Sequence, residues 1–352
     1  MKPRLSVVIP SFNRPNFLLR CIKFLVSYKL PIQLIILDSS EKKFENIELN
    51  NLIKEFNIIV KKFSADIFIV KKIAKGCEFI NTDYSVLVAD DDLLCPMALL
   101  KCVDFLDTNP DYSSAQGLHF NHTNYEETIK SGFNQFQLYP KGKSVIDEKS
   151  SNRIKKYLTG KSHNYPYYSV QKTKDFKLIW ENTDRYADDW ELGEYFPSCM
   201  SLIFGKMKVL PLFYSSREPT IHDPGAHRRY KRTMSNDKIF KASRGLANFL
   251  NQYEDISLSD AEKLFFNYFL TEKKQVLERK KSNKVLTMAL LRKLFRLISF
   301  KSSNIKKYSS KFNFNINEFY KVKSAIISSQ ASTDEIQASK ELHNRTNSRK
   351  YY

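Results

Sequence analysis

Apolar and polar positions follow one another along the first 120 residues in short blocks that predict strands and helices in turn. Runs rich in β-branched residues predict strands at 5–10, 32–40, 58–63, 84–89 and 112–120. Apolar residues three and four positions apart predict helices over 16–28, 44–56, 71–80 and 97–106. Strands that alternate with helices are typical of a parallel sheet covered on both faces. The predicted fold class is therefore α/β, a Rossmann-like, mostly parallel sheet flanked by helices.

The pattern changes beyond residue 120. Residues 125–161 are polar, rich in lysine and weakly periodic, which is typical of a variable insertion or loop. Residues 165–170 contain three tyrosines and predict an aromatic strand. From residue 240 onward the spacing of apolar residues is mostly helical. This half of the chain is therefore less regular than the first.

Positive charge is concentrated near the C-terminus. The formal net charge is +19, and residues 272–352 contribute 19 Lys and Arg against 6 Asp and Glu, which is +13 of that total. Such a region can meet anionic lipid, an anionic glycan or nucleic acid. Residues 284–298 form a basic amphipathic segment, which fits either a membrane surface or a helix packed on the core with a solvated basic face.

The changes in apolar pattern and in charge along the chain predict that it is divided into three regions. We expect an α/β domain over 1–235 with halves 1–120 and 121–235, a helical basic region over 236–328, and a disordered polar tail over 329–352. No run of 18 apolar residues occurs, and the N-terminus resembles a strand rather than a signal peptide. Five cysteines without a C-x-x-C pair predict neither a zinc site nor a disulfide framework. We expect a cytoplasmic protein, with peripheral contact to the inner face of the plasma membrane as an option.

Three successive acids end the fourth predicted strand. The apolar run 86–89 leads directly into Asp90, Asp91 and Asp92. Burying three like charges without compensation is very costly, so they should lie at the edge of the sheet, where ligands of open α/β sheets bind. Closely spaced carboxylates suit hard cations such as Mg²⁺ and Mn²⁺. Taken alone, the run also fits solvated acids that cap the following helix.

Polar side chains also follow the other strands. Ser11 and Asn13 come after the first strand and Asp38 ends the second. Because the carboxyl ends of parallel strands share one edge, these groups should gather beside the acids. No G-x-G-x-x-G or Walker-type loop is present, which disfavours a dinucleotide or P-loop fold.

Three motifs in order make the chain resemble one family. They are Val7-Val8-Ile9-Pro10-Ser11-Phe12-Asn13-Arg14, then Leu37-Asp38-Ser39-Ser40, then Val88-Ala89-Asp90-Asp91-Asp92. They resemble the GT-A nucleotide-sugar domain of family 2 glycosyltransferases, which has a Val-Ile-Pro-x-Tyr-Asn-Arg start, an Asp at the end of the second strand and an Asp-x-Asp motif after the fourth. The resemblance covers roughly residues 1–120. Phe12 in place of the usual Tyr and the unbroken run of three acids depart from the pattern.

The resemblance implies roles for the donor half of the domain. Residues expected to bind the nucleotide sugar are Pro10, Ser11, Asn13, Arg14, Asp38, Asp90 and Asp91. Asp92 is the first choice as metal ligand, while Asp90 would lie nearer the ribose and also reach the metal. Lys72 and Lys75 either pair with the diphosphate or are ordinary solvated helix lysines.

Further candidates lie in the second half. Asp188 and Asp189 resemble the family's Glu/Asp-Asp motif, in which the second acid is the general base. That role needs a carboxylate that accepts a proton from the acceptor hydroxyl. The plainer interpretation is two acids that favour a helix dipole. His222, which resembles a late-loop histidine that reaches the metal or the diphosphate, is equally well a surface residue. Nearby arginines, of which Arg217 is the first, could hold a diphosphate.

The resemblance implies an inverting glycosyltransferase that depends on Mn²⁺ or Mg²⁺. Its donor would be a nucleoside-diphosphate sugar, and its acceptor a glycan or lipid-linked glycan, with a bacterial surface polysaccharide as our choice. Three alternatives stay open: nucleotidyl transfer on a similar sheet, a basic nucleic-acid-binding protein, and a degenerate GT-A domain without activity, against which the acids retained at both sites argue. The first normally needs a glycine-rich opening loop, and the second shows no recognised module here, so we expect no nucleic acid partner.

Overall fold

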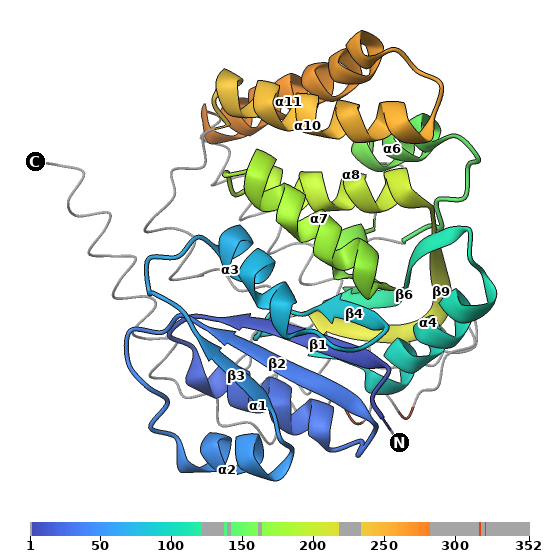
Figure 1. Cartoon of the computed structure of the whole chain (residues 1–352). Helices are drawn as coiled ribbons and strands as arrows, with labels where there is room; N and C mark the ends of the chain where they lie inside the picture. Colours follow the sequence, from blue (N-terminus) through green and yellow to red (C-terminus); the bar gives the residue numbers. More distant parts are fainter. Residues whose placement is uncertain are drawn as a thin grey trace, which may run out of the picture.

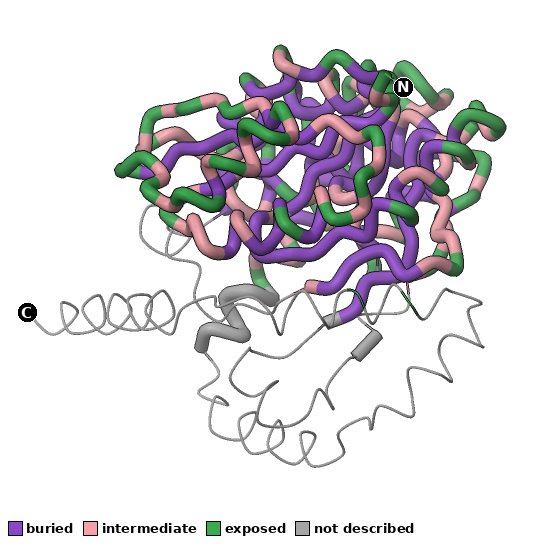
Figure 2. Tube along the Cα trace, turned by 90° about the horizontal axis from the view of Figure 1, so that it is seen from below, coloured by how far each residue is buried: buried purple, intermediate pink, exposed green. Residues whose placement is uncertain are grey.

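The computed structural model describes residues 2–121, 137–138, 142–160, 164–217 and 234–281, together with 317 and 321. Its centre is a twisted sheet with the strand order β3-β2-β1-β4-β8-β6-β9-β5, and β7 pairs with β6 (Figure 1). The sheet is flanked by helices on both faces, and the predicted α/β class is confirmed. Figure 2 shows buried segments running through the interior of this part of the chain, with exposed segments mainly around it.

The first half of the sheet is parallel, as predicted. Its strands are β1 (Leu5–Ser11), β2 (Ile32–Asp38), β3 (Ile59–Lys62) and β4 (Tyr84–Leu87). β1 pairs with both β2 and β4, and β2 pairs with β3. The connecting helices are α1 (Pro15–Val26), α2 (Ile47–Glu55) and α3 (Ile69–Gly76). All four strands and three helices occur where the apolar periodicity predicted them, with ends shifted by a few residues.

Both faces of these strands are apolar because both are covered. Val7 and Ile9 of β1 pack with α1 and with α4 (Pro96–Thr108) in one cluster. Val8, which points to the opposite face, packs with α3 and α7 (Thr173–Tyr186). Successive side chains of a strand alternate between faces, so a strand buried on both sides shows a continuous apolar run. The carboxyl ends of β1, β2 and β4 are left at one edge, beside the polar turns.

The second half of the sheet is mixed. β6 (Tyr112–Asn121) lies parallel to β9 (Lys206–Arg217) and antiparallel to β7 (Gln137–Leu138) and β8 (Val170–Lys172), and β8 is antiparallel to β4. The short strand β5 (Leu93–Leu94), directly after the three aspartates, is antiparallel to β9. β9 therefore ends close to residue 92.

The predicted aromatic strand over 165–170 is wrong. Pro166–Tyr168 form a single 3-10 turn, and β8 begins only at Val170. Pro166 has no backbone N–H to give to a sheet and fixes its own φ angle. The backbone closes on itself instead, with the amide of Tyr168 donating to the carbonyl of Tyr165 at 2.9 Å. The turn directs Tyr167 and Tyr168 toward the edge of the sheet described below.

Four further helices form a layer on the α3 and α7 side of the sheet (Figure 1). They are α6 (Ser150–Leu158), α8 (Leu192–Phe204), α10 (Asn236–Tyr253) and α11 (Leu258–Lys281). Side chains of α10 and α11 share one apolar cluster with Phe196 and Leu202 of α8. The helical character predicted after residue 236 is confirmed over 236–281, and the division at 235 stays a prediction. No helix in the described residues is both long and apolar enough to span a bilayer.

Candidate functional site

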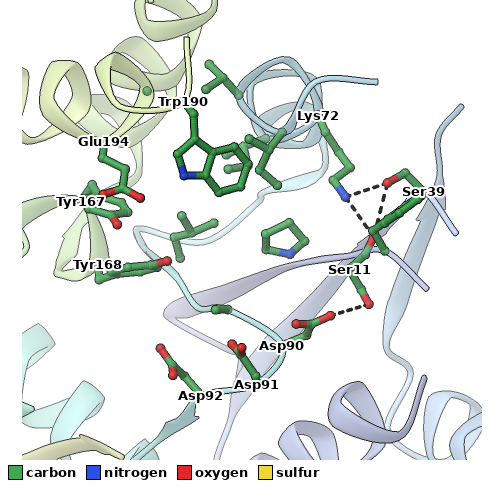
Figure 3. Close-up of a pocket in the computed structure, with 18 of the residues that line it drawn as sticks. Ser11, Ser39, Lys72, Asp90, Asp91, Asp92, Tyr167, Tyr168, Trp190 and Glu194 are labelled. Carbon is green, nitrogen blue, oxygen red and sulfur yellow. Dashed lines mark hydrogen bonds between the residues drawn. The ribbon is translucent and has the colours of Figure 1, made fainter. Parts of the chain in front are cut away.

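A cavity of about 310 Å³ opens at the carboxyl edge of β1 and β4 (Figure 3). Its walls come from segments far apart in the sequence. They are Pro10, Ser11, Phe12 and Arg14 after β1, Ser39 after β2, Ala65, Ile67, Ile69, Val70, Lys72 and Ile73 around the start of α3, Leu87, Ala89 and Asp90 to Asp92 at the end of β4, Tyr167 and Tyr168, Trp180 on α7, Trp190, Gly193 and Glu194 at the start of α8, and Arg217 at the end of β9. This is the edge at which the polar turns were predicted to gather.

The three aspartates form one wall of the cavity and are nonetheless buried. Asp90, Asp91 and Asp92 are only 3%, 7% and 5% exposed. Arg14 pairs with Asp90 at 3.0 Å and with Asp91 at 2.7 Å, and the Nε of Arg217 donates to Asp92 at 3.2 Å. These guanidinium groups supply the compensation without which three buried carboxylates would be very costly.

Two more groups hold the acidic run in place. The hydroxyl of Ser11 donates to Asp90 at 2.7 Å, and Arg20 on α1 donates to the backbone carbonyl of Asp91 at 2.7 Å. Both side chains are buried. The run is therefore fixed to the β1 turn and to α1 before any ligand arrives, which is the preorganisation that a binding site needs.

Arg217 lies between two tyrosines. Its guanidinium carbon is 5.0 Å from the ring centre of Tyr165 and 5.2 Å from that of Tyr168, both within the range of cation–π contacts. Burial works against its charge, but Asp92 and the surrounding tyrosines more than offset this and raise the pKa of Arg217. The late arginines were expected to be able to hold a diphosphate, and Arg217, the one of them within the described residues, lines the cavity.

The two candidate lysines of α3 differ in position. Lys72 is buried beside the cavity, and its Nζ donates to the carbonyl of Ser11 and to the hydroxyl of Ser39, each at 2.9 Å (Figure 3). Lys75 is exposed and is not among the residues that line the cavity. Positions three apart lie only about 60° from each other around a helix, and the boundary between the packed and the solvent-exposed side of α3 falls between these two lysines.

Asn13 and Asp38 join the turns beside the cavity. The left-handed backbone of Asn13, with φ of 54°, lets its amide donate to Ser40 while its side chain accepts from the amide of Glu41, both at 2.9 Å. The buried carboxylate of Asp38 accepts from the amide of Ser40 at 2.8 Å and from Lys62 at 2.6 Å. Neither residue is among those that line the cavity, but both fix the turns after β1 and β2, whose residues Phe12, Arg14 and Ser39 do line it.

The second acidic pair, Asp188 and Asp189, is not among the residues that line the cavity. Asp188 is exposed and faces Lys238 of α10, whose Nζ donates to its backbone carbonyl at 2.9 Å. Asp189 is buried, and its carboxylate accepts from the backbone amide of Glu191 at 3.1 Å. The side chain that faces the cavity from this segment is Glu194, in the first turn of α8, with Trp190 beside it (Figure 3). Sequence motifs missed Glu194, whose only signal was its place a few residues after the second acidic pair.

Oxygen ligands for a cation are present at the acidic run. Asp90 and Asp92 both line the cavity, and carboxylates with open space for phosphate oxygens are the donor set that Mg²⁺ and Mn²⁺ prefer. Among the residues that the structure describes, no group of three or more His, Cys, Asp or Glu is arranged as a metal site. His222, the third predicted ligand, lies outside the described residues. The residues present thus fit a cation that takes some of its oxygen ligands from Asp90 and Asp92 and the others from a bound diphosphate.

Comparison with known proteins identifies the scaffold. The family model described as "Glycosyl transferase family 2" matches residues 6–171. Among solved structures, that of residues 1–349 of TarS from S. aureus aligns with a TM-score of 0.52 and 12% identity, covering 81% of this chain and 75% of that one. The same fragment in complex with UDP-GlcNAc aligns with a TM-score of 0.53 and 12% identity, covering 76% and 72%.

The structure of the longer S. aureus TarS aligns with a TM-score of 0.50 and 12% identity, over 76% of this chain, and the chain spans only 43% of that structure. At this identity the structural likeness concerns the fold. It agrees with the family match, which includes β1 to β4, the acidic run and the segment up to β8. Residues 6–171 of this chain therefore belong to a family 2 glycosyltransferase domain with the GT-A fold.

Proposed function

We propose that the protein is a glycosyltransferase that moves a sugar from a nucleoside-diphosphate sugar to a hydroxyl group of a glycan or lipid-linked glycan. One observation carries this proposal: a buried run of three carboxylates shares a cavity with Arg14, Lys72 and Arg217 at the carboxyl edge of a family 2 domain. Mixed charges of this kind suit a diphosphate and the cation that accompanies it, whereas either sign alone would suit only one of them.

The walls of the cavity match the parts of such a donor. Phe12 and the apolar side chains of residues 65–73 can contact the flat face of a base, while Lys72 and Arg217 can pair with phosphate oxygens. A TarS structure contains UDP-GlcNAc, so a UDP-sugar is our first candidate donor. Pro10, Ser11 and Arg14 would border the nucleotide, and Asn13 and Asp38 would support that wall from behind.

A divalent cation, Mn²⁺ or Mg²⁺, would be held by Asp92 and Asp90 together with the donor's diphosphate. Bound there, it would supply positive charge to the phosphate oxygens that become the leaving group. The chain's own contribution is to fix both carboxylates through Ser11 and Arg14 and to place further positive charge nearby. His222 is retained as a further ligand candidate by its position in the sequence.

The reaction would be a single displacement with inversion at the anomeric carbon. The acceptor hydroxyl attacks from the side opposite the diphosphate and gives its proton to a carboxylate beside the cavity. The sequence motif points to Asp189 for this role, with Asp188 as its neighbour. For the place of action we keep the cytoplasm, with the basic C-terminal region in contact with an anionic membrane surface.

Nucleotide binding tests the proposal. Thermal unfolding of the full chain would be followed with UDP, GDP, CDP and dTDP, each with and without Mn²⁺, for the wild type and Asp92→Ala. We expect one nucleotide to raise the melting temperature by several degrees only when Mn²⁺ is present, and the variant to lose that rise. The matched control is Asp188→Ala, an exposed acid outside the cavity wall, which should keep it. Absence of any nucleotide response in the wild type would refute the proposal.

A further inference from the structure

One polar atom in the wall of the cavity has no partner. Trp180, on α7, lines the cavity and is only 2% exposed. Within the part of the chain that the structure describes, its indole N–H donates to no acceptor, and no other residue of the cavity wall leaves a buried side-chain nitrogen or oxygen unpaired. Native proteins rarely bury a donor without an acceptor, because the lost hydrogen bonds to water are not replaced. The unpaired N–H therefore indicates a ligand group that accepts a hydrogen bond.

The surroundings of Trp180 restrict what that group can be. Trp180 belongs to one apolar cluster with Val70, Ile73 and Phe176, and its ring centre is 6.1 Å from that of Phe176. These three side chains offer no hydrogen-bond acceptor. A hydroxyl group would bring a proton that itself needs an acceptor, whereas a carbonyl oxygen needs only a donor. The site at Trp180 therefore suits a carbonyl oxygen better than a hydroxyl group.

A carboxylate borders the same end of the cavity. A Cβ at Gly193 would lie 2.8 Å from a methyl group of Val70, so the first turn of α8 lies directly against α3. The next residue, Glu194, is exposed and lines the cavity, as does the half-buried Trp190. Figure 3 shows both side chains across the cavity from Asp90. This end thus combines apolar and aromatic walls with an acceptor, apart from the acids expected to hold the cation.

An acetamido group has the three properties that this end of the cavity calls for. Its carbonyl oxygen accepts a hydrogen bond, its N–H donates one, and its methyl group is apolar. We propose that Trp180 is a specificity-determining residue, which selects a donor whose sugar carries an acetamido group. The N–H of Trp180 donates to the carbonyl oxygen, Glu194 accepts from the amide N–H, and Val70 contacts the methyl group. This inference rests on the proposed function, because it specifies the sugar of that donor.

The first test uses the wild type alone. Calorimetry with the full chain and Mn²⁺ compares UDP-GlcNAc, UDP-glucosamine and UDP-glucose, which carry an acetamido, an amino and a hydroxyl group at the same carbon of the sugar. We expect UDP-GlcNAc to bind at least about tenfold more tightly than either of the others, because only its carbonyl group satisfies the buried N–H.

The second test removes the N–H and keeps an aromatic ring. We expect Trp180→Phe to raise the Kd for UDP-GlcNAc about tenfold and to change the Kd values for UDP and UDP-glucose by less than about twofold. The matched control is Trp190→Phe, the same substitution at the other of the two tryptophans in the chain. It should change the Kd values for UDP-GlcNAc and UDP-glucose by one common factor.

Four results would overturn the inference. Equal affinity of the wild type for UDP-GlcNAc and either other sugar would do so without any variant. A common rise in all Kd values of Trp180→Phe would make Trp180 a packing residue, and a loss of preference in Trp190→Phe alone would move the role to Trp190. A wild type that does not bind UDP would overturn the UDP-sugar donor itself, which is seen before any sugars are compared.

Discussion

The two acidic segments of the chain look alike in sequence and have different positions in the structure. Asp90 to Asp92 are buried, held by two arginines, and face the cavity. Asp188 and Asp189 lie at a turn before α8, one of them exposed and the other bonded to backbone. The first segment continues a buried strand, whose end has to be at the sheet edge. The second follows an irregular turn, where small changes in backbone angles redirect each side chain. The lesson is that an acidic motif has a predictable place only when a regular element delivers it.

The largest expected effect is on turnover, which should fall far more for a substitution in the first acidic segment than for one in the second. Asp92→Asn removes a carboxylate from the cavity, and we expect a loss of about 10²–10³-fold, comparable to removing a principal transition-state contact. Asp188→Asn should change turnover less than about threefold, since its side chain faces Lys238. UDP release from UDP-GlcNAc measures both. Equal effects of the two substitutions would contradict the distinction drawn here.

The next effect concerns the stability of the acidic run. Arg14→Met leaves Asp90 and Asp91 buried without their guanidinium partner, and we expect the free energy of unfolding to fall by about 3–5 kcal/mol. The control is Arg4→Met, which breaks a half-exposed pair with Asp107 and should cost less than about 1 kcal/mol. Urea denaturation gives both values. A loss for Arg14→Met as small as the control's would mean that the run does not need this compensation.

His119 tests the converse case, a buried group near positive charge. Burial, with a smaller contribution from Arg217, lowers the pKa of His119 to about 3, while its Nδ1 lies 2.6 Å from the hydroxyl of Ser215. Below pH 6.5 the unfolded chain binds a proton that the folded chain refuses until about pH 3. The stability contributed by the neutral ring is therefore present above pH 6.5 and is lost as the pH falls through this window.

We expect this loss to reach a few kcal/mol, at about 1.4 kcal/mol for each pH unit. His119→Gln should make the free energy of unfolding less dependent on pH between 6.5 and 5, above the range in which most carboxylates titrate. Denaturation curves at several pH values measure the difference between variant and wild type. An unchanged slope in the variant would show that His119 does not titrate differently in the two states.

The smallest effect compares the two lysines of α3. Lys72→Met removes a buried charge beside the cavity, and we expect the Kd for UDP with Mn²⁺ to rise about tenfold, or about 1.4 kcal/mol. Lys75→Met changes an exposed residue of the same helix and should leave the Kd within a factor of two. Calorimetry distinguishes the two variants. An equal rise in the Kd of both variants would mean that the overall positive charge of the surface, and not the position of Lys72, determines UDP binding.

The parallel half of the molecule could be predicted from the sequence alone. Each βαβ unit is local, its strands are buried on both faces and are therefore continuously apolar, and its helices show the 3.6-residue period. The acidic run could be placed at the sheet edge because it directly follows the carboxyl end of a buried strand, and that end lies at the edge of the sheet. The family resemblance, carried by the motifs at 7–14, 37–40 and 88–92, was confirmed by the match over residues 6–171. Local pattern and global fold agree in this half.

Only the tertiary structure decided the rest of the site. Arg217 and Asp92 are 125 positions apart and meet because β9 pairs with β5, a contact between strands that no local pattern records. The choice of Lys72 over Lys75 depends on which face of α3 packs on the sheet. The choice of Glu194 over Asp189 as the acid facing the cavity depends on how closely α8 approaches α3 at Gly193. The physical reason is common to all three: local periodicity determines elements, whereas the packing between elements determines which side chains share a cavity.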